Sequence, residues 1–119
     1  MAVLVSSFGT TQLSLPDPVP PIPIAAQMTL PSGDWILTFD QLLQPGLSAI
    51  TNWGFRANNL IRSAMAPVTI SGNTVSAASS PGPPSVGFDF ITYNAGIPDV
   101  IGVNGLAVEA FSGFPLTVL

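Results

Sequence analysis

Residues 68–77 read Val-Thr-Ile-Ser-Gly-Asn-Thr-Val-Ser-Ala, and this stretch decides the fold class. Apolar and polar residues alternate on both sides of Gly72-Asn73, as they do in strands with one buried face. Both residues of the Gly-Asn pair tolerate the positive φ angles that a two-residue hairpin turn requires. The stretch therefore predicts a β-hairpin.

Short apolar segments between turn signals continue on both sides of this hairpin. After a turn at residues 31–34, Trp35, Leu37 and Phe39 lie on one face of a predicted strand. Residues 52–58 and 60–65 favour two further strands, although a helical stripe also fits residues 53–64. Trp35 and Trp53 are expected in the core.

The C-terminal part of the chain follows the same pattern. A long strand is expected near residues 86–93, and the last two strands are expected at residues 106–108 and 116–119. The prolines of residues 81–84 indicate a loop, because proline has no N–H for a strand ladder. About seven or eight strands over residues 31–119 predict an all-β sandwich or barrel.

Residues 1–30 are predicted to form a separate, extended N-terminal arm. Five of the eight residues from 16 to 23 are proline, which favours polyproline II of roughly 25 Å. One interpretation is a plain disordered tail, and the other is an arm that docks on a neighbouring subunit. Deleting residues 2–24 is expected to leave the sandwich folded. The candidate interface residues in the arm are apolar side chains and prolines: Val3, Leu4, Val5, Phe8, Leu13, Leu15, Pro18, Pro20, Pro21 and Pro23.

Charged residues are scarce. They make up 7% of the chain, whereas ordinary domains have about a quarter, and the net charge is −4. The only cations, Arg56 and Arg62, cannot supply the phosphate contacts that nucleic acids or anionic membranes require. Each is either a surface residue weakly paired with a carboxylate or an interface anchor. A surface so poor in charge predicts a component of an assembly.

The residues that most chemistry needs are missing. The chain has no Cys and no His, so no disulfide, thiolate site or histidine base can form. We expect no cofactor and no enzymatic activity. Asp99 with Asn104 could hold Ca²⁺ through mixed oxygen ligands, but capping of turns by Asx side chains is the simpler interpretation.

From Gly33 onward the sequence resembles the bacterial immunoglobulin-like repeats of cyanobacterial swimming proteins and other large surface proteins. The resemblance rests on Gly-Asp-Trp-Ile-Leu-Thr-Phe-Asp at residues 33–40, Ile-Ser-Gly-Asn-Thr-Val at 70–75 and Thr92-Tyr93. It extends through residues 97–108 to Phe-Ser-Gly at 111–113, where Val103 separates Gly102 from Asn104, which are usually adjacent in the family. The resemblance implies an immunoglobulin-like β-sandwich over residues 31–119 that serves as a spacer, adhesive or structural module.

The whole chain is also similar in architecture to phage capsid decoration proteins. It starts at Met1 with neither a basic n-region nor a long apolar run, so we expect synthesis in a host cytoplasm without export. We therefore expect a virion structural protein, a decoration (cement) protein on a bacteriophage capsid. Its expected partner is the major capsid protein or another virion protein. Copies of the chain are also expected to form a homo-oligomer, a trimer. The alternative is an adhesive or spacer module of a bacterial cell-surface or secreted protein.

Overall fold

The predicted hairpin at Gly72-Asn73 joins the two longest strands of the protein, β5 (Leu60–Ser71) and β6 (Thr74–Pro84). Gly72 has a φ of 61°, as the predicted turn requires. The computed structural model describes residues 18–119 of the chain. The other elements in this range are β1 (Pro23–Thr29), β2 (Asp34–Phe39), β3 (Gly46–Ser48), a 3-10 helix η1 (Ile50–Asn52), β4 (Trp53–Ala57), β7 (Phe90–Tyr93), β8 (Phe111–Pro115) and β9 (Thr117–Val118).

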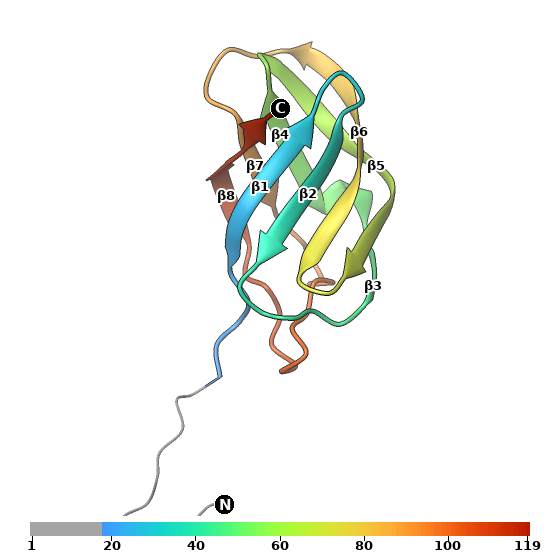
Figure 1. Cartoon of the computed structure of the whole chain (residues 1–119), viewed down its shortest axis with the longest axis vertical. Helices are drawn as coiled ribbons and strands as arrows, with labels where there is room; N and C mark the ends of the chain where they lie inside the picture. Colours follow the sequence, from blue (N-terminus) through green and yellow to red (C-terminus); the bar gives the residue numbers. More distant parts are fainter. Residues whose placement is uncertain (1–17) are drawn as a thin grey trace, which may run out of the picture.

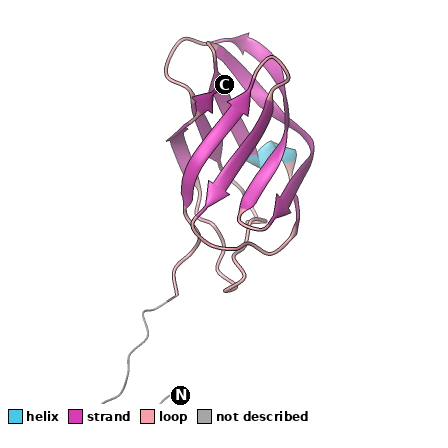
Figure 2. Ribbon diagram, in the orientation of Figure 1, coloured by secondary structure: helices cyan, strands magenta, loops and turns pink. Residues whose placement is uncertain are grey.

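The fold is all-β, and the strands curl into a mixed sheet that is nearly a barrel (Figures 1 and 2). The order of strands is β8-β7-β4-β5-β6-β2-β1-β9, and β3 pairs with β5 outside this path. All pairs are antiparallel except β1 with β9. Because Leu116 alone separates β8 from β9, the two ends of the sheet meet along one seam between β8 and β1.

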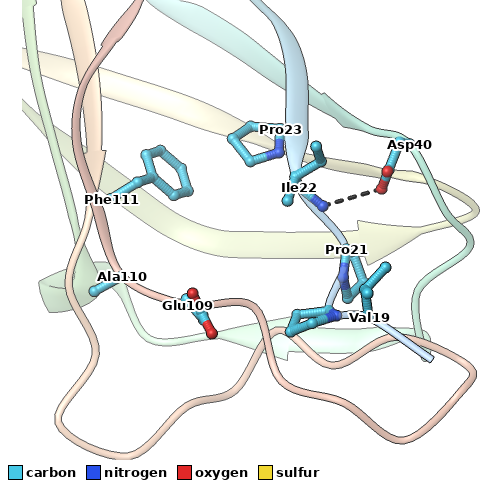
Figure 3. A pocket seen from close by; sticks show the side chains of 9 residues that line it. Val19, Pro21, Ile22, Pro23, Asp40, Glu109, Ala110 and Phe111 are labelled. Atoms are coloured by element: carbon cyan, nitrogen blue, oxygen red, sulfur yellow. Dashed lines mark hydrogen bonds between the residues drawn. The ribbon is translucent and has the colours of Figure 1, made fainter. Parts of the chain in front are cut away.

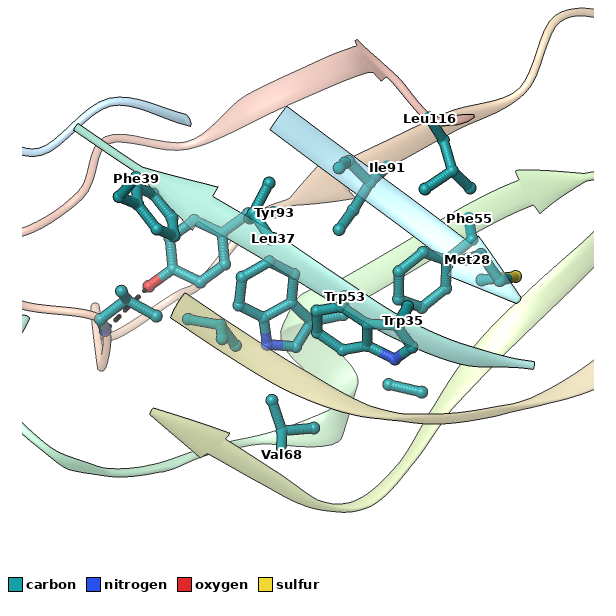
Figure 4. Packing of buried hydrophobic residues seen from close by; sticks show 14 of the residues in the cluster. Met28, Trp35, Leu37, Phe39, Trp53, Phe55, Val68, Ile91, Tyr93 and Leu116 are labelled. Carbon is teal, nitrogen blue, oxygen red and sulfur yellow. Dashed lines mark hydrogen bonds between the residues drawn. The ribbon is translucent and has the colours of Figure 1, made fainter. Parts of the chain in front are cut away.

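The core consists of aromatic and aliphatic side chains inside this curled sheet (Figure 4). Trp35 packs against Trp53 and Phe55, with ring centroids 5.2 and 4.9 Å apart, and Trp53 packs against Tyr93 at 4.7 Å. Such offset aromatic pairs add to the free energy of burial alone. The prediction that both tryptophans are core residues is confirmed.

The alternation predicted for β2 is also confirmed. Trp35, Leu37 and Phe39 are almost fully buried, whereas Ile36 between them is 39% exposed. The expected strands near residues 52–58 and 60–65 correspond to β4 and to the first half of β5, so the helical alternative is wrong.

Three expectations about strands are corrected by the structure. The prolines of residues 81–84 belong to β6, where Pro81 and Pro84 lie opposite Arg62 and Leu60. This part of β6 extends past the segment that pairs with β2, so its other side is an open sheet edge, where a missing N–H is tolerated. The strand expected over residues 86–93 begins only at Phe90, and residues 106–108 contribute a single bridge, between Ala107 and Ile101.

The N-terminal boundary also differs from the expected one at residue 31. Residues 23–29 form β1, which pairs with β2 from Thr29-Asp34 to Pro23-Phe39. Ala26 and Met28 point into the core and are buried. The alternation of residues 24–29 thus places this segment in the sheet, and the arm ends upstream of it.

Candidate docking surface at the barrel seam

A groove runs along one half of the seam, where the starts of β1 and β8 approach each other without pairing. β9 pairs with β1 at Gln27 and Met28, whereas β8 pairs only with β7 among residues 18–119. The groove has a volume of about 420 Å³ and is mainly apolar. Figure 3 shows Phe111 on one wall and Ile22 with Pro23 on the other, with the carboxylates of Asp40 and Glu109 nearby. Its lining is Val19, Pro20, Pro21, Ile22, Pro23, Asp40, Glu109, Ala110 and Phe111.

The root of the arm, which we define as Val19 to Pro23, is fixed beside this groove by hydrogen bonds. The Ile22 N–H donates to Asp40 Oδ1 and the Asp40 N–H donates to the Ile22 carbonyl, both at 3.0 Å. The Val19 carbonyl accepts bonds from Asn104 Nδ2 at 2.9 Å and Gln41 Nε2 at 3.1 Å. The segment from Val19 to Pro23 is therefore a docked part of the domain and not a free spacer.

Three exposed aliphatic side chains lie at this root, one on the root itself and two on neighbouring loops. Val19, Leu42 and Val103 are 58, 59 and 61% exposed, and we call them the apolar tip. The Val103 N–H donates to the Leu42 carbonyl at 3.0 Å, and Asn104 bonds to Val19 as described, so the three segments are held together. The loops that carry Leu42 and Val103 lie at the same end of the domain as the start of β1 (Figure 1), so this end combines the groove with an apolar surface.

The connection between β6 and β7 lies at the opposite end of the domain (Figure 1), and it carries a second exposed apolar cluster. Val86 is 88% exposed and Phe88 64%, and the Phe88 ring lies 5.5 Å from that of Phe90. The Arg56 guanidinium stacks over the Phe90 ring, 5.1 Å from its centroid. It also lies against Gly87, where the Cβ of any larger residue would collide with the guanidinium. This contact explains why residues 86–89 leave the strand alignment expected from their alternation.

Neither arginine forms a salt bridge with a carboxylate of residues 18–119. Arg62 is 5% exposed; its Nε donates to Ser79 Oγ at 2.9 Å and its Nη2 to the Ser79 carbonyl at 3.2 Å. Arg56 donates to Ser85 Oγ at 2.7 and 3.0 Å. Arg62 is thus a buried structural residue of this chain, and only Arg56 offers surface to a partner.

Asp99 is the centre of a hydrogen-bond network that fixes the long loop before β8. Its carboxylate accepts bonds from Ser48 Oγ at 2.8 Å, from the Ala49 N–H at 2.7 Å and from Asn52 Nδ2 at 3.0 Å. Asn104 Oδ1 instead accepts the Leu106 N–H at 3.1 Å, which is an Asx turn. Donors approach both Asp99 oxygens, so the geometry is that of a loop cap. Among residues 18–119 no group of three or more acidic residues is placed to hold a metal ion.

Tyr93 completes this network. Its hydroxyl donates to Asp99 Oδ1 at 3.3 Å and accepts the N–H groups of Asp99 and Val100 at 3.2 and 3.4 Å. Burial raises the pKa of the phenol above its ordinary value of 10.0; the two backbone N–H groups oppose this rise and the Asp99 carboxylate adds to it.

The structure brings together some of the interface residues expected from the sequence and separates others. Pro20, Pro21 and Pro23 line the groove, and Pro21 is fully buried against the domain, while Pro18 is exposed. Arg56 and Arg62 do not line the groove. Val3, Leu4, Val5, Phe8, Leu13 and Leu15 lie outside the described residues.

Sequence reasoning missed the opposite wall of the groove, formed by Glu109, Ala110 and Phe111, and the anchoring role of Asp40. In the sequence, Phe111 is singled out only by the resemblance of residues 111–113 to the immunoglobulin-like repeats. No local pattern predicts that these residues face the segment that precedes β1.

Comparison of the chain with protein-family models, characterised proteins and solved structures found no match in any of the three. In the part of the chain that the structure describes, no helix is long and apolar enough to cross a membrane.

Proposed function

We propose that this chain is a non-enzymatic structural protein of a bacteriophage virion, a capsid decoration (cement) protein that binds the outer surface of the head. The observation that carries the proposal is the apolar tip of Val19, Leu42 and Val103 at the root of the arm. Apolar surface of this kind, beside a groove and on a protein with 7% charged residues, favours burial against a partner.

In this proposal the domain is an immunoglobulin-like sandwich. The strand order supports this classification, since β1, β2, β6 and the second half of β5 correspond to one sheet and β4, β7 and β8 to the other. The ladder between β5 and β6 shifts register between Met65 and Thr69, where β5 would pass from one sheet to the other. Immunoglobulin-like domains serve many functions, so the fold supports a structural role without specifying it.

The proposed partner is the major capsid protein or another virion protein. The arm-bearing end faces the capsid, and copies surround a symmetry axis, with a trimer as the simplest closed arrangement. The protein reaches this location after synthesis in the host cytoplasm.

Binding to undecorated capsids tests the proposal. We expect the L42E/V103E variant to bind at least tenfold more weakly, because carboxylates at the tip would have to be desolvated in the interface. The matched control is V86E at the opposite end, which should bind like the unchanged protein. Equal binding of both variants would contradict the proposed orientation.

A truncation tests the contribution of the arm. Deleting residues 2–17 should leave the fold intact and abolish binding. The longer deletion of residues 2–24, which the sequence alone predicted to leave the sandwich folded, is now expected to destabilise the domain itself. It removes buried Pro21 and the two Ile22–Asp40 hydrogen bonds. If the protein does not bind capsids but binds bacterial cells, the alternative of an adhesive or spacer module is favoured.

A further inference from the structure

The seam between β1 and β8 is closed by strand pairing near the end of β1 and open near the starts of β1 and β8. The ladder between β1 and β9 covers Gln27 and Met28, and below it the groove separates Pro23 from Phe111. We propose that residues Ala2–Val5 of a second copy of this chain occupy the groove as an added strand along β8. This inference deepens the assembly role proposed above and rests on it.

An extended peptide fits the chemistry of the groove. Within residues 18–119, β8 has one partner strand, β7, so its other edge presents backbone donors and acceptors toward the seam. Most of the side chains that line the groove are apolar, and they include Phe111, Ala110 and Ile22. Main-chain hydrogen bonds together with recesses for alternate side chains are the elements of recognition by strand addition.

Residues Ala2–Val5 supply the matching chemistry. Val3 and Val5 would lie on one face of a strand and point into the groove, and valine has high β-propensity. Residues 1–15 carry no charged side chain, so the segment avoids repulsion by the exposed carboxylates of Asp40 and Glu109 at the groove. An acidic segment would meet that repulsion.

The position of the arm root favours exchange between copies. Val19 lines the groove itself, and the sequence immediately upstream contains Pro18 and Pro16, a residue type whose fixed φ angle favours extended backbone. Residues 6–15 then span up to about 33 Å when extended, which is enough to reach a neighbouring domain. Each copy would donate one segment and accept another, and such head-to-tail contacts form a ring where the rotation between copies closes and an open filament where it does not.

Disulfide trapping tests this exchange, because the chain has no cysteine of its own. Purified V5C and A110C variants are mixed under a mild oxidant, and the mixed dimer is distinguished by mass from the two homodimers. We expect at least tenfold more mixed dimer than from V5C with T69C, whose cysteine lies at an exposed position of β5 far along the sheet from the seam. A peptide of residues 1–15 should suppress the trapping.

The remaining outcomes overturn the inference. If the V5C/A110C double variant closes only within one chain and the mixed singles do not react, the segment occupies its own groove. If neither reacts while tryptophan fluorescence reports a folded A110C variant, the groove takes a ligand of another kind. Trapping uses no capsid, so failed trapping with normal capsid binding refutes the exchange alone. Successful trapping without capsid binding refutes the proposed function alone.

Discussion

Replacing Asp99 with alanine should destabilise the protein by about 3 kcal/mol. The carboxylate holds Ser48, Ala49 and Asn52 through bonds of 2.7 to 3.0 Å, and Tyr93 through a longer bond of 3.3 Å. These contacts tie the segment before β4 to the loop after β7, which are separated by about fifty residues in sequence. Removal of the acceptor releases both segments together.

The magnitude follows from the burial of each donor. A hydrogen bond to a charged group contributes about 1.5–3 kcal/mol, so the three short bonds would sum to more than about 4 kcal/mol if none were replaced. Ala49 is exposed and can bond to water, so its bond is discounted. Ser48 is 7% exposed and also accepts the Trp53 indole N–H at 2.8 Å, so its hydroxyl loses a partner that water cannot easily replace.

Urea unfolding followed by tryptophan fluorescence measures this loss. Asp99→Asn keeps one oxygen acceptor and should lose about half as much stability as Asp99→Ala. Asp34→Ala is the matched control, since that carboxylate is exposed at the start of β2, and its change should stay within about 0.5 kcal/mol. A loss below about 1 kcal/mol for Asp99→Ala would refute the view that this network fixes the loop.

Two further predictions concern Tyr93 and the turn glycines. Because burial raises the pKa of Tyr93, the stability that its neutral phenol contributes is complete below about pH 10 and is lost as the pH rises through the folded-state pKa. Tyrosinate absorbance, which reports this one tyrosine alone, should therefore appear at higher pH in the folded than in the urea-unfolded chain, and equal midpoints would contradict the argument. Gly33→Ala should cost more than about 2 kcal/mol in thermal or urea unfolding, because φ is 82° and the new Cβ would lie 2.6 Å from the Ser79 carbonyl oxygen. Gly72→Ala, at a φ of 61° with open space around it, should cost only about 1 kcal/mol, and equal losses would show that the steric contact is relieved.

Local patterns sufficed where one strand face is buried and the turn residues are distinctive. The hairpin at Gly72 and the buried face of Trp35, Leu37 and Phe39 could be predicted for this reason. The same rule failed at Val86 and Phe88, which alternate as in a strand yet are exposed. There the Arg56 guanidinium packs on Gly87 and bonds to Ser85, and residues 86–89 do not continue the strand. These contacts join residues about thirty positions apart in sequence.

Two predictions made from the positions of prolines were wrong. At residues 81–84 they were expected to end a strand, but an open edge removes the need for their missing N–H groups. At residues 16–23 they predicted a polyproline spacer within an arm that ends at residue 30, whereas Pro23 begins a strand and Pro21 is buried. Proline fixes the local φ angle, but which side of a strand is open depends on tertiary neighbours.

The groove depends on tertiary neighbours in the same way, since its two walls are about ninety residues apart in sequence. What the sequence did indicate was the shortage of charge, and the fold makes this shortage more pronounced. Of the seven charged residues between positions 18 and 119, five form side-chain hydrogen bonds within the domain: Asp40, Asp89, Asp99, Arg56 and Arg62. Charges committed to such bonds contribute less to the hydrated surface that keeps a free protein apart from its neighbours. At the end that carries the apolar tip, Asp40 is one of the charges bonded in this way, so Glu109 is the remaining exposed charge among the residues that line the groove, and we place the contact with a partner at that end.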